Sequence, residues 1–304
     1  MSAGLAGIRL AVIGGDDREI YMIRELQKQG AYIIGVGFEK APSMDGVELL
    51  SSPMEVIGKA DALLFPMYGT DESGVVRGKY TDSTIVLNQE LLKMVKPNVP
   101  LFIGWARPAL KSAAKMLEIP IIEVANLDQV AILNSIPSAE GAIQMAMEVS
   151  EITIHGSQSF VLGLGRCGWT LARMLNGIGA SVTGVARRPE DLARGLEMGI
   201  NVLHFGELEE KIQQAEFIFN TVPKLILDKT MLDQMNKDAI IIDIASSPGG
   251  MDFDYAKSLG IRALLAPGLP GKVAPKTAGK ILAQIYPQLI LRHLTTNDHL
   301  TPEE

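Results

Sequence analysis

The feature of this sequence that most constrains its fold is a glycine motif near the middle of the chain. Gly163, Gly165 and Gly168 form a G-x-G-x-x-G pattern that follows a strand-like apolar run and opens a helix-like segment. In this pattern the first glycine permits a tight turn, the second lets the backbone approach a pyrophosphate, and the third lets helix and strand pack closely. The helix amino terminus offers free N–H groups to phosphates, so the motif predicts a dinucleotide site. The expected cofactor contacts here are Gly163, Gly165, Arg166, Cys167 and Gly168.

Strand-like apolar runs alternate with helix-like segments on both sides of this motif. Over residues 152–276 the alternation gives six strands with short crossovers, which is a complete Rossmann unit. Residues 1–137 show the same rhythm, and their near-continuous apolar strands are typical of a parallel sheet covered by helices on both faces. We therefore predict an α/β fold with two doubly wound parallel-sheet domains and a cleft between them. The first would be the substrate or catalytic domain and the second the dinucleotide-binding domain.

Two helical segments lie outside these alternations. Residues 138–151 are good helix formers with Ser138 as the expected N-cap, so we predict a helix that links the domains. Residues 277–292 predict a last helix, which we expect to pack back on the first domain, and residues 293–304 predict a polar tail. No stretch reaches the roughly 18 apolar residues that span a bilayer, so we expect neither a membrane anchor nor a signal peptide.

The net charge and the cysteine content limit the kinds of ligand and partner that the chain can have. The formal net charge is −7 and no run of lysines and arginines creates a local basic patch, which argues against nucleic acid. The single cysteine, Cys167, can form neither an intramolecular disulfide nor a multi-cysteine metal site, which favours a reducing compartment, the cytoplasm. We interpret Cys167 as a small packing residue, expect no metal, and expect small-molecule ligands.

The choice between NAD and NADP should be made at the end of the second strand of the Rossmann unit. An Asp or Glu there would bind the ribose hydroxyls of NAD, but the sequence has Ala186, Arg187 and Arg188 instead. Guanidinium groups suit a phosphate, so we predict NADP as the cofactor. The alternative is that both arginines cap a strand end in solvent.

Later loops of the same unit are rich in small and turn-forming residues, as expected where a flat nicotinamide ring lies against backbone. For Thr221 and Asp243 a local turn role is an equal alternative. The contacts expected from these loops are Thr221, Val222, Pro223, Asp243, Ala245 and Gly268.

The first half of the chain offers fewer candidate ligand-binding residues. Gly14 and Gly15 resemble half of a phosphate loop, but Asp16 and Asp17 would repel a phosphate, so we interpret these two as helix caps. We expect the substrate in the cleft between the domains. Arg107 is favoured for a substrate carboxylate because its planar fork binds one bidentately, although a surface role is an alternative.

Histidines are scarce where an acid–base group would be expected. Dehydrogenases of hydroxy acids commonly use a histidine of the cofactor domain to handle the hydroxyl proton, yet none lies between Phe205 and Arg292. We interpret His155, His204, His293 and His299 as structural or solvated. An alcohol oxidation is therefore disfavoured.

Three motifs beyond the glycine loop resemble the A subunit of bacterial dipicolinate synthase. They are Asn134 to Ala142, Asp243 to Gly250 and Pro270 to Gly279, and the resemblance covers nearly the whole chain. It implies a place in a lysine-pathway branch that makes pyridine-2,6-dicarboxylate in sporulating bacteria. It also implies a partner, the flavoprotein-like B subunit of dipicolinate synthase, and we expect a homo-oligomer.

The implied reaction is oxidation of a dihydrodipicolinate-type ring, with NADP taking the hydride. Aromatisation favours loss of the ring proton, so positioning would do most of the work. Lys272 would bind a substrate carboxylate or accept the proton, and Ser135 and Thr277 are further expected substrate contacts, with Thr277 as the cap of the last helix. Two alternatives stay open: an NADP-dependent dehydrogenase of a small hydroxy or amino acid, and an NADP-binding subunit that performs no chemistry.

Overall fold

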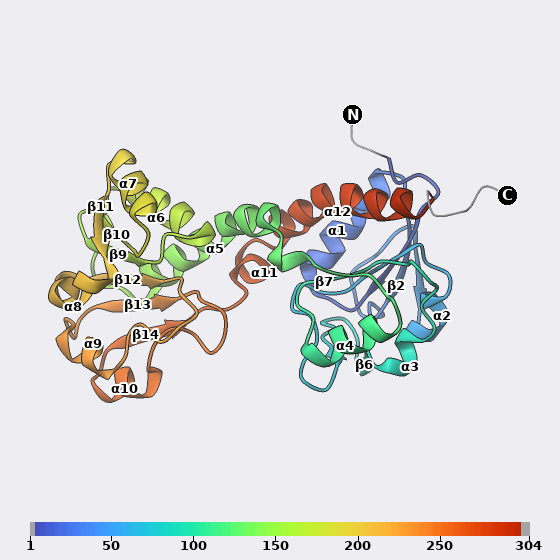
Figure 1. Ribbon diagram of the computed structural model, residues 1–304, viewed down its shortest axis with the longest axis horizontal. Helices are drawn as coiled ribbons and strands as arrows, with labels where there is room; N and C mark the ends of the chain where they lie inside the picture. The colour runs from blue at the N-terminus through green and yellow to red at the C-terminus, as the bar shows by residue number, and fades with distance from the viewer. Residues whose placement is uncertain (1–3, 299–304) are drawn as a thin grey trace. The chain divides into compact units, whose positions relative to one another are not determined.

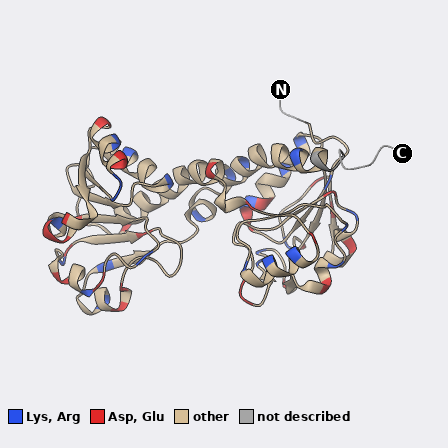
Figure 2. Cartoon of the chain, viewed as in Figure 1, with Lys and Arg blue, Asp and Glu red and all other residues tan. Residues whose placement is uncertain are grey.

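The computed structural model describes residues 4–298. These residues form two compact units (Figure 1). Unit 1 contains the described residues up to Ala131 together with those from Ala274 onward, and unit 2 is Ile132–Val273. Basic and acidic residues are interspersed over both units (Figure 2). Within the described residues no helix is long and apolar enough to cross a membrane.

Unit 1 is built on a parallel sheet in the order β3-β2-β1-β4-β7-β8. A short antiparallel pair, β5 and β6, lies outside this sheet. The elements of unit 1 are β1 (Arg9–Ile13), α1 (Asp17–Lys28), β2 (Tyr32–Val36), β3 (Val47–Leu50), α2 (Pro53–Ile57), β4 (Ala62–Leu64), β5 (Val75–Val76), β6 (Ile85–Val86), α3 (Gln89–Leu92), β7 (Leu101–Ile103), α4 (Pro108–Met116), β8 (Ile121–Glu123) and α12 (Pro275–Asp298).

Unit 2 contains a second parallel sheet, in the order β11-β10-β9-β12-β13-β14. Its elements are α5 (Asp128–Val149, which begins in unit 1), β9 (Gln158–Leu162), α6 (Arg166–Ile178), β10 (Ser181–Ala186), α7 (Pro189–Glu197), β11 (Asn201–His204), α8 (Leu208–Lys211), β12 (Phe217–Asn220), α9 (Lys229–Gln234), β13 (Ile240–Asp243), α10 (Phe253–Ser258), β14 (Arg262–Leu265) and α11 (Leu269–Val273).

Both sheets therefore have six parallel strands in one topology, and the prediction of two doubly wound domains is confirmed. The strands of unit 2 are apolar on both sides because helices cover both faces. Val161 packs with Leu171 of α6, whereas its neighbours Phe160 and Leu162 pack with the side chains of α8 to α10. Adjacent residues of a strand point to opposite faces, so a continuous apolar run fills two cores.

The helix predicted over residues 138–151 begins ten residues earlier, at Asp128, and Pro137 lies inside it. Ser138 is therefore not an N-cap. Its hydroxyl donates to the Asn134 carbonyl at 2.8 Å, and the Ser135 hydroxyl donates to the Ile132 carbonyl at 2.6 Å. These bonds flank the carbonyl that Pro137 deprives of its usual donor, which is how the helix accommodates a residue that normally ends one.

The last helix, α12, is also longer than expected, because it begins at Pro275 and continues to Asp298. Residues 293–298 are thus helical rather than a tail, and residues 299–304 lie outside the described part. The helix packs against α1 in unit 1 (Figure 1). Gly279 makes this contact close, since a Cβ atom there would lie 2.4 Å from the Arg18 carbonyl oxygen.

Candidate functional site

The loop between β9 and α6 has the geometry that the glycine motif predicts. Gly163 has a φ of +90°, and a Cβ atom at Gly168 would lie 1.8 Å from the Gly163 carbonyl oxygen, so both positions require glycine. Gly165 is the N-cap of α6 and makes no side-chain capping bond, and nothing lies within 4 Å of where its Cβ would stand. The loop thus presents open backbone and uncapped N–H groups, which fits a pyrophosphate.

The loop after β12 supports the glycine loop from the side. Strands β9 and β12 are neighbours at the point where the strand order of unit 2 reverses, which is where such sheets bind ligands. The Thr221 hydroxyl lies 3.0 Å from the carbonyls of Leu162 and Gly163 and donates to them. Val222 follows, with a methyl group 2.7 Å from the position of a Gly163 Cβ. Thr221 therefore fixes the loop through its hydroxyl.

Asp243 occupies the carboxyl end of β13 and is completely buried. Its oxygens accept hydrogen bonds from Asn220 Nδ2 and the Ala245 N–H, both at 3.0 Å, and from the Gly250 N–H at 2.7 Å. These bonds agree with the alternative that Asp243 stabilises local turns, because its carboxylate oxygens accept hydrogen bonds from the protein itself. Asn220, the last residue of β12, also accepts from the Val222 N–H at 3.1 Å and ties the two loops together.

The two arginines after β10 differ in their surroundings. Arg188 binds the Asp191 carboxylate through Nε and Nη2, both at 2.8 Å. Its guanidinium group is therefore already engaged by a residue in the first turn of α7. Arg187 lines a hollow of about 240 Å³ together with Lys224. The other residues of the hollow are apolar: Phe205, Leu208, Val222, Leu225, Ile226 and Met231. Lys224 is a second cation that only the tertiary structure brings to this place.

The remaining expected cofactor contacts surround the same strand ends. Arg166 and Pro223 are exposed, and Ala186 and Ala245 are buried. Gly268 has a φ of +69° and precedes α11. Burial raises the pKa of the Cys167 thiol despite the opposing charge of Arg166, which fits the interpretation of Cys167 as a packing residue.

Three residues expected to contact the substrate have surroundings that the sequence did not predict. Ser135 is completely buried and shares a 2.5 Å hydrogen bond with the Thr170 hydroxyl, so its side chain is engaged inside unit 2 rather than presented to a ligand. Thr277 lies inside the first turn of α12 and does not cap it, because the helix starts at Pro275. Lys272 is exposed, but it belongs to the short helix α11 rather than to a loop.

Arg107 is the N-cap residue of α4 and its side chain is half exposed. Its Nε donates to the Thr70 carbonyl at 3.3 Å, and Nη1 lies 3.7 Å from the Glu72 carboxylate. The residue borders a hollow of about 350 Å³ in unit 1. Its guanidinium therefore already has a backbone acceptor and an exposed carboxylate beside it.

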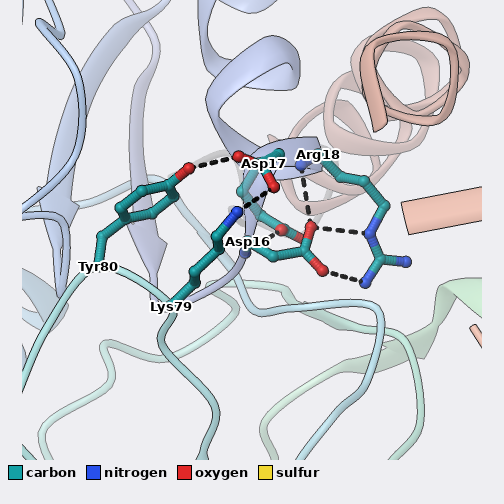
Figure 3. A network of polar contacts seen from close by, with 6 residues as sticks. Asp16, Asp17, Arg18, Lys79 and Tyr80 are labelled. Carbon is teal, nitrogen blue, oxygen red and sulfur yellow. Dashed lines mark hydrogen bonds and ion pairs between the residues drawn. The ribbon is translucent and has the colours of Figure 1, made fainter. Parts of the chain in front are cut away.

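The turn after β1 carries a polar network (Figure 3). Asp16 accepts from the Arg18 N–H at 2.9 Å while Glu19 accepts from the Asp16 N–H at 2.7 Å, a reciprocal capping box that confirms the interpretation of Asp16 as a cap. Burial opposes ionisation of Asp16, but the bonds and charge of Arg18 outweigh it and lower the pKa. Asp17 binds Lys79 and Tyr80, and these bonds likewise lower its pKa against the effect of burial.

The described histidines have structural contacts. His155 Nδ1 lies 2.9 Å from the Ile178 carbonyl, and His204 accepts from the Gly206 N–H at 3.1 Å. His293 stands edge-on to Phe102, and burial together with Arg292 lowers its pKa. His299 lies outside the described residues. Over residues 4–298, no group of three or more histidine, cysteine, aspartate or glutamate side chains is arranged to hold a metal ion.

Family models match both halves of the chain. Residues 9–125 match the N-terminal domain of the A subunit of dipicolinate synthase, and residues 135–248 match the NAD binding domain of D-isomer specific 2-hydroxyacid dehydrogenases. The second match shows that unit 2 contains a pyridine-nucleotide-binding domain.

Similarity to individual proteins extends over almost the full length. The A subunit of dipicolinate synthase from Bacillus subtilis (strain 168) is 40% identical over 94% of this chain and 97% of its own. The crystal structure of the same subunit from Bacillus halodurans has a TM-score of 0.91 at 38% identity, covering 94% of this chain and 99% of that one. A transhydrogenase from Sinorhizobium meliloti, with a TM-score of 0.66 and 13% identity over 94% of each chain, shares the fold.

Proposed function

The chain belongs to the family of dipicolinate synthase A subunits, and from this membership we propose that it uses NADP to oxidise a dihydrodipicolinate-type intermediate to pyridine-2,6-dicarboxylate. The observation that carries the proposal is the open backbone at Gly165, because it belongs to a dehydrogenase-type nucleotide domain in a chain that matches the family over its length. We place the reaction in a lysine-pathway branch of sporulating cells.

The residues present fit a dinucleotide. Gly165 leaves space for a pyrophosphate, the amino terminus of α6 is uncapped, and Arg187 and Lys224 border a hollow with an otherwise apolar lining. When bound, the cofactor supplies the acceptor for a hydride from the ring. The protein has to hold the ring in place and receive or release one proton, and aromatisation makes that proton loss favourable. The exposed Lys272 side chain is our candidate for binding a carboxylate or accepting the proton.

We propose NADP rather than NAD because the end of β10 has no carboxylate and the hollow beside it holds two cations, Arg187 and Lys224. Calorimetric titration of both cofactors tests the choice. NADP should bind about tenfold or more tightly than NAD, and Arg187→Ala should remove most of that preference. Arg188→Ala is the matched control and should have a smaller effect, since Asp191 holds that side chain. Equal affinities of the wild-type chain for NAD and NADP would refute the choice.

We further propose that turnover needs a second polypeptide, the flavoprotein-like B subunit of the synthase, and that the chain forms a homo-oligomer. The support is that the matching relative is itself described as one subunit of an enzyme, and that the described histidines have structural contacts. NADPH absorbance is followed with a dihydrodipicolinate-generating system, with and without the partner. We expect NADP binding by the chain alone and turnover only with the partner, and light scattering gives the oligomeric state.

The same assay separates the alternatives. Full activity of the isolated chain would contradict the dependence on a partner. Oxidation of small hydroxy or amino acids in place of the dihydrodipicolinate-type substrate would make the chain a dehydrogenase of those acids. If the reaction proceeds equally fast with a chain that no longer binds NADP, the cofactor role proposed for this protein is wrong.

A further inference from the structure

The carboxyl edge of the first sheet gathers cationic side chains at the place where its strand order reverses. Strands β1 and β4 are neighbours there, and open α/β sheets bind ligands in the crevice outside such strand ends. Arg18 follows β1 in the first turn of α1, and Tyr68 follows β4. Arg77 and Lys79 come from the segment after β5. Arg18, Arg77 and Lys79 were not expected from the sequence to belong to a site.

The backbone around these side chains is fixed. The Gly15 N–H donates to the Arg77 carbonyl at 2.9 Å, and the Lys79 N–H donates to the Gly15 carbonyl at 2.8 Å. On the other side, a Cβ atom at Gly69 would lie 2.1 Å from the Trp105 carbonyl oxygen, so the loop after β4 rests directly on the loop after β7. Two neighbouring strand ends therefore hold Arg77 and the residues beside Tyr68 in defined positions.

The Tyr68 ring has two guanidinium groups within reach. The Arg18 guanidinium carbon is 4.7 Å from the ring centroid and that of Arg77 is 5.4 Å away, both within the range of cation–π attraction. Contact with an aromatic ring leaves guanidinium N–H groups available to bind an anion. Tyr68 is also 36% exposed, so the cluster is open to solvent.

Two of the three cations in the cluster are already paired with carboxylates. Arg18 is 5% exposed and uses Nε and Nη2 to bind Asp16, at 2.9 and 2.8 Å. Lys79 is paired with Asp17 (Figure 3). Within the described part of the chain, Arg77 has an exposed side chain and no ion pair with a carboxylate. One guanidinium without a carboxylate partner thus remains available at the ligand-binding edge.

We propose that Arg77 binds a carboxylate of the planar dicarboxylate substrate, with Tyr68 and Arg18 as the residues that position its guanidinium. This inference rests on the proposed function and names the side chain that recognises the substrate class. Arg77 supplies the two parallel N–H donors that suit a carboxylate. Tyr68 restricts where the guanidinium lies, and Arg18, itself neutralised by Asp16, supports the ring from a second position.

The test is calorimetric titration of the full chain, saturated with NADP, with pyridine-2,6-dicarboxylate. Arg77→Gln should weaken binding by about tenfold or more, the loss expected for a bidentate charge-assisted contact. Arg24→Gln is the matched control, because Arg24 is also an exposed arginine of unit 1 beside a tyrosine ring, 5.8 Å from the Tyr21 centroid. Its affinity for the dicarboxylate should stay within twofold of the wild type. NADP affinity should be unchanged in both variants.

Turnover in the presence of the partner separates the inference from the proposed function. If the wild type oxidises the substrate and Arg77→Gln binds and reacts like Arg24→Gln, the role of Arg77 is overturned while the function stands. If pyridine-2,6-dicarboxylate binds in an Arg77-dependent way but no NADPH forms, the site stands and the proposed oxidation is wrong. If the wild type does not bind the dicarboxylate, the inference is overturned whatever the turnover shows.

Discussion

Gly165 and Gly168 stand three residues apart in the loop between β9 and α6, yet their surroundings differ. Gly168 faces the Gly163 carbonyl oxygen so closely that any side chain must displace backbone, whereas Gly165 faces open space. Gly168 therefore serves the folded loop, and Gly165 leaves room for a ligand. At the residue scale, stability and ligand binding are separable within one motif.

Two alanine substitutions separate these roles. Gly165→Ala places a methyl group in open space at a φ of −90°, so the thermal midpoint should stay near that of the wild type while NADP affinity falls by about tenfold or more. Gly168→Ala should lower the free energy of unfolding by roughly 1–3 kcal/mol, since the loop must move to admit the methyl group. Thermal unfolding and NADP titration measure both effects.

Gly177→Ala in α6 is the control for this pair, because nothing lies within 4 Å of its Cβ position. An alanine inside a helix should raise stability by about 0.5–1 kcal/mol without changing NADP affinity. Unchanged NADP affinity in Gly165→Ala would mean that the pyrophosphate does not approach this part of the backbone.

The amino terminus of α1 follows the end of β1, carries a capping box and lies in the helix that packs against α12. Glu19 completes the capping box but is itself buried, and this burial raises its pKa to about 7. The groups that act on it are Arg18 and Asp16 of its own segment, and Glu19 in turn acts on Tyr286 of α12. Burial raises the pKa of Tyr286 further, so this hydroxyl stays protonated. At the element scale, one helix cap therefore links stability to pH.

The stability contribution of Glu19 should fall as pH rises. Its pKa is about 7 in the folded chain against an ordinary value of 4.5, so between these values the unfolded chain releases a proton that the folded chain keeps. The free energy of unfolding contributed by this group should then decline from about pH 4.5 to about pH 7 and level off above. Glu19→Gln keeps an acceptor for the Asp16 N–H and does not titrate.

The measurement is the difference in thermal midpoint between wild type and Glu19→Gln from pH 5 to pH 8, which should shift in favour of the variant as pH rises. Glu25→Gln on the same helix is the control. Its side chain is partly exposed and the bond with Lys28 lowers its pKa, so the corresponding difference should stay flat over this range. A flat difference for Glu19→Gln as well would contradict a raised pKa at this position.

The whole molecule repeats one topology in two units with separate cores. The core of unit 1 includes Ile13, Leu63 and Leu101, and unit 2 has one core on each face of its sheet. The described residues up to Ala131 belong to unit 1, and α12 returns the chain to it. Because each sheet has its own apolar packing, opening of one unit need not expose the other.

Hydrogen exchange should reveal this division. NADP that binds only the folded form of unit 2 stabilises it by about 2.7 kcal/mol at a concentration one hundred times its dissociation constant. Exchange in strands β9 to β13 should slow accordingly, while exchange in α1 and α12 should change much less. Equal slowing in both units would show that they open as a single cooperative body.

The sequence by itself determined the features that depend on neighbours along the chain. Buried parallel strands require continuous apolar runs, and these predicted both sheets except the edge strand β3, whose half-exposed Val47–Leu50 contains a glutamate. The glycine loop and the Asp16 cap are likewise local, because the backbone that each residue serves lies within a few positions of it.

Only the tertiary structure decided which side chains are accessible and which are already engaged. Ser135 is hidden against Thr170, 35 positions away, and Asp243 is bound by Asn220 from the neighbouring strand. Lys224 joins Arg187, and Arg77 joins Tyr68, through contacts between separate loops. Parallel strands bring distant residues to one edge, so the surroundings of a charge or hydroxyl depend on strand order, which spacing along the chain does not specify.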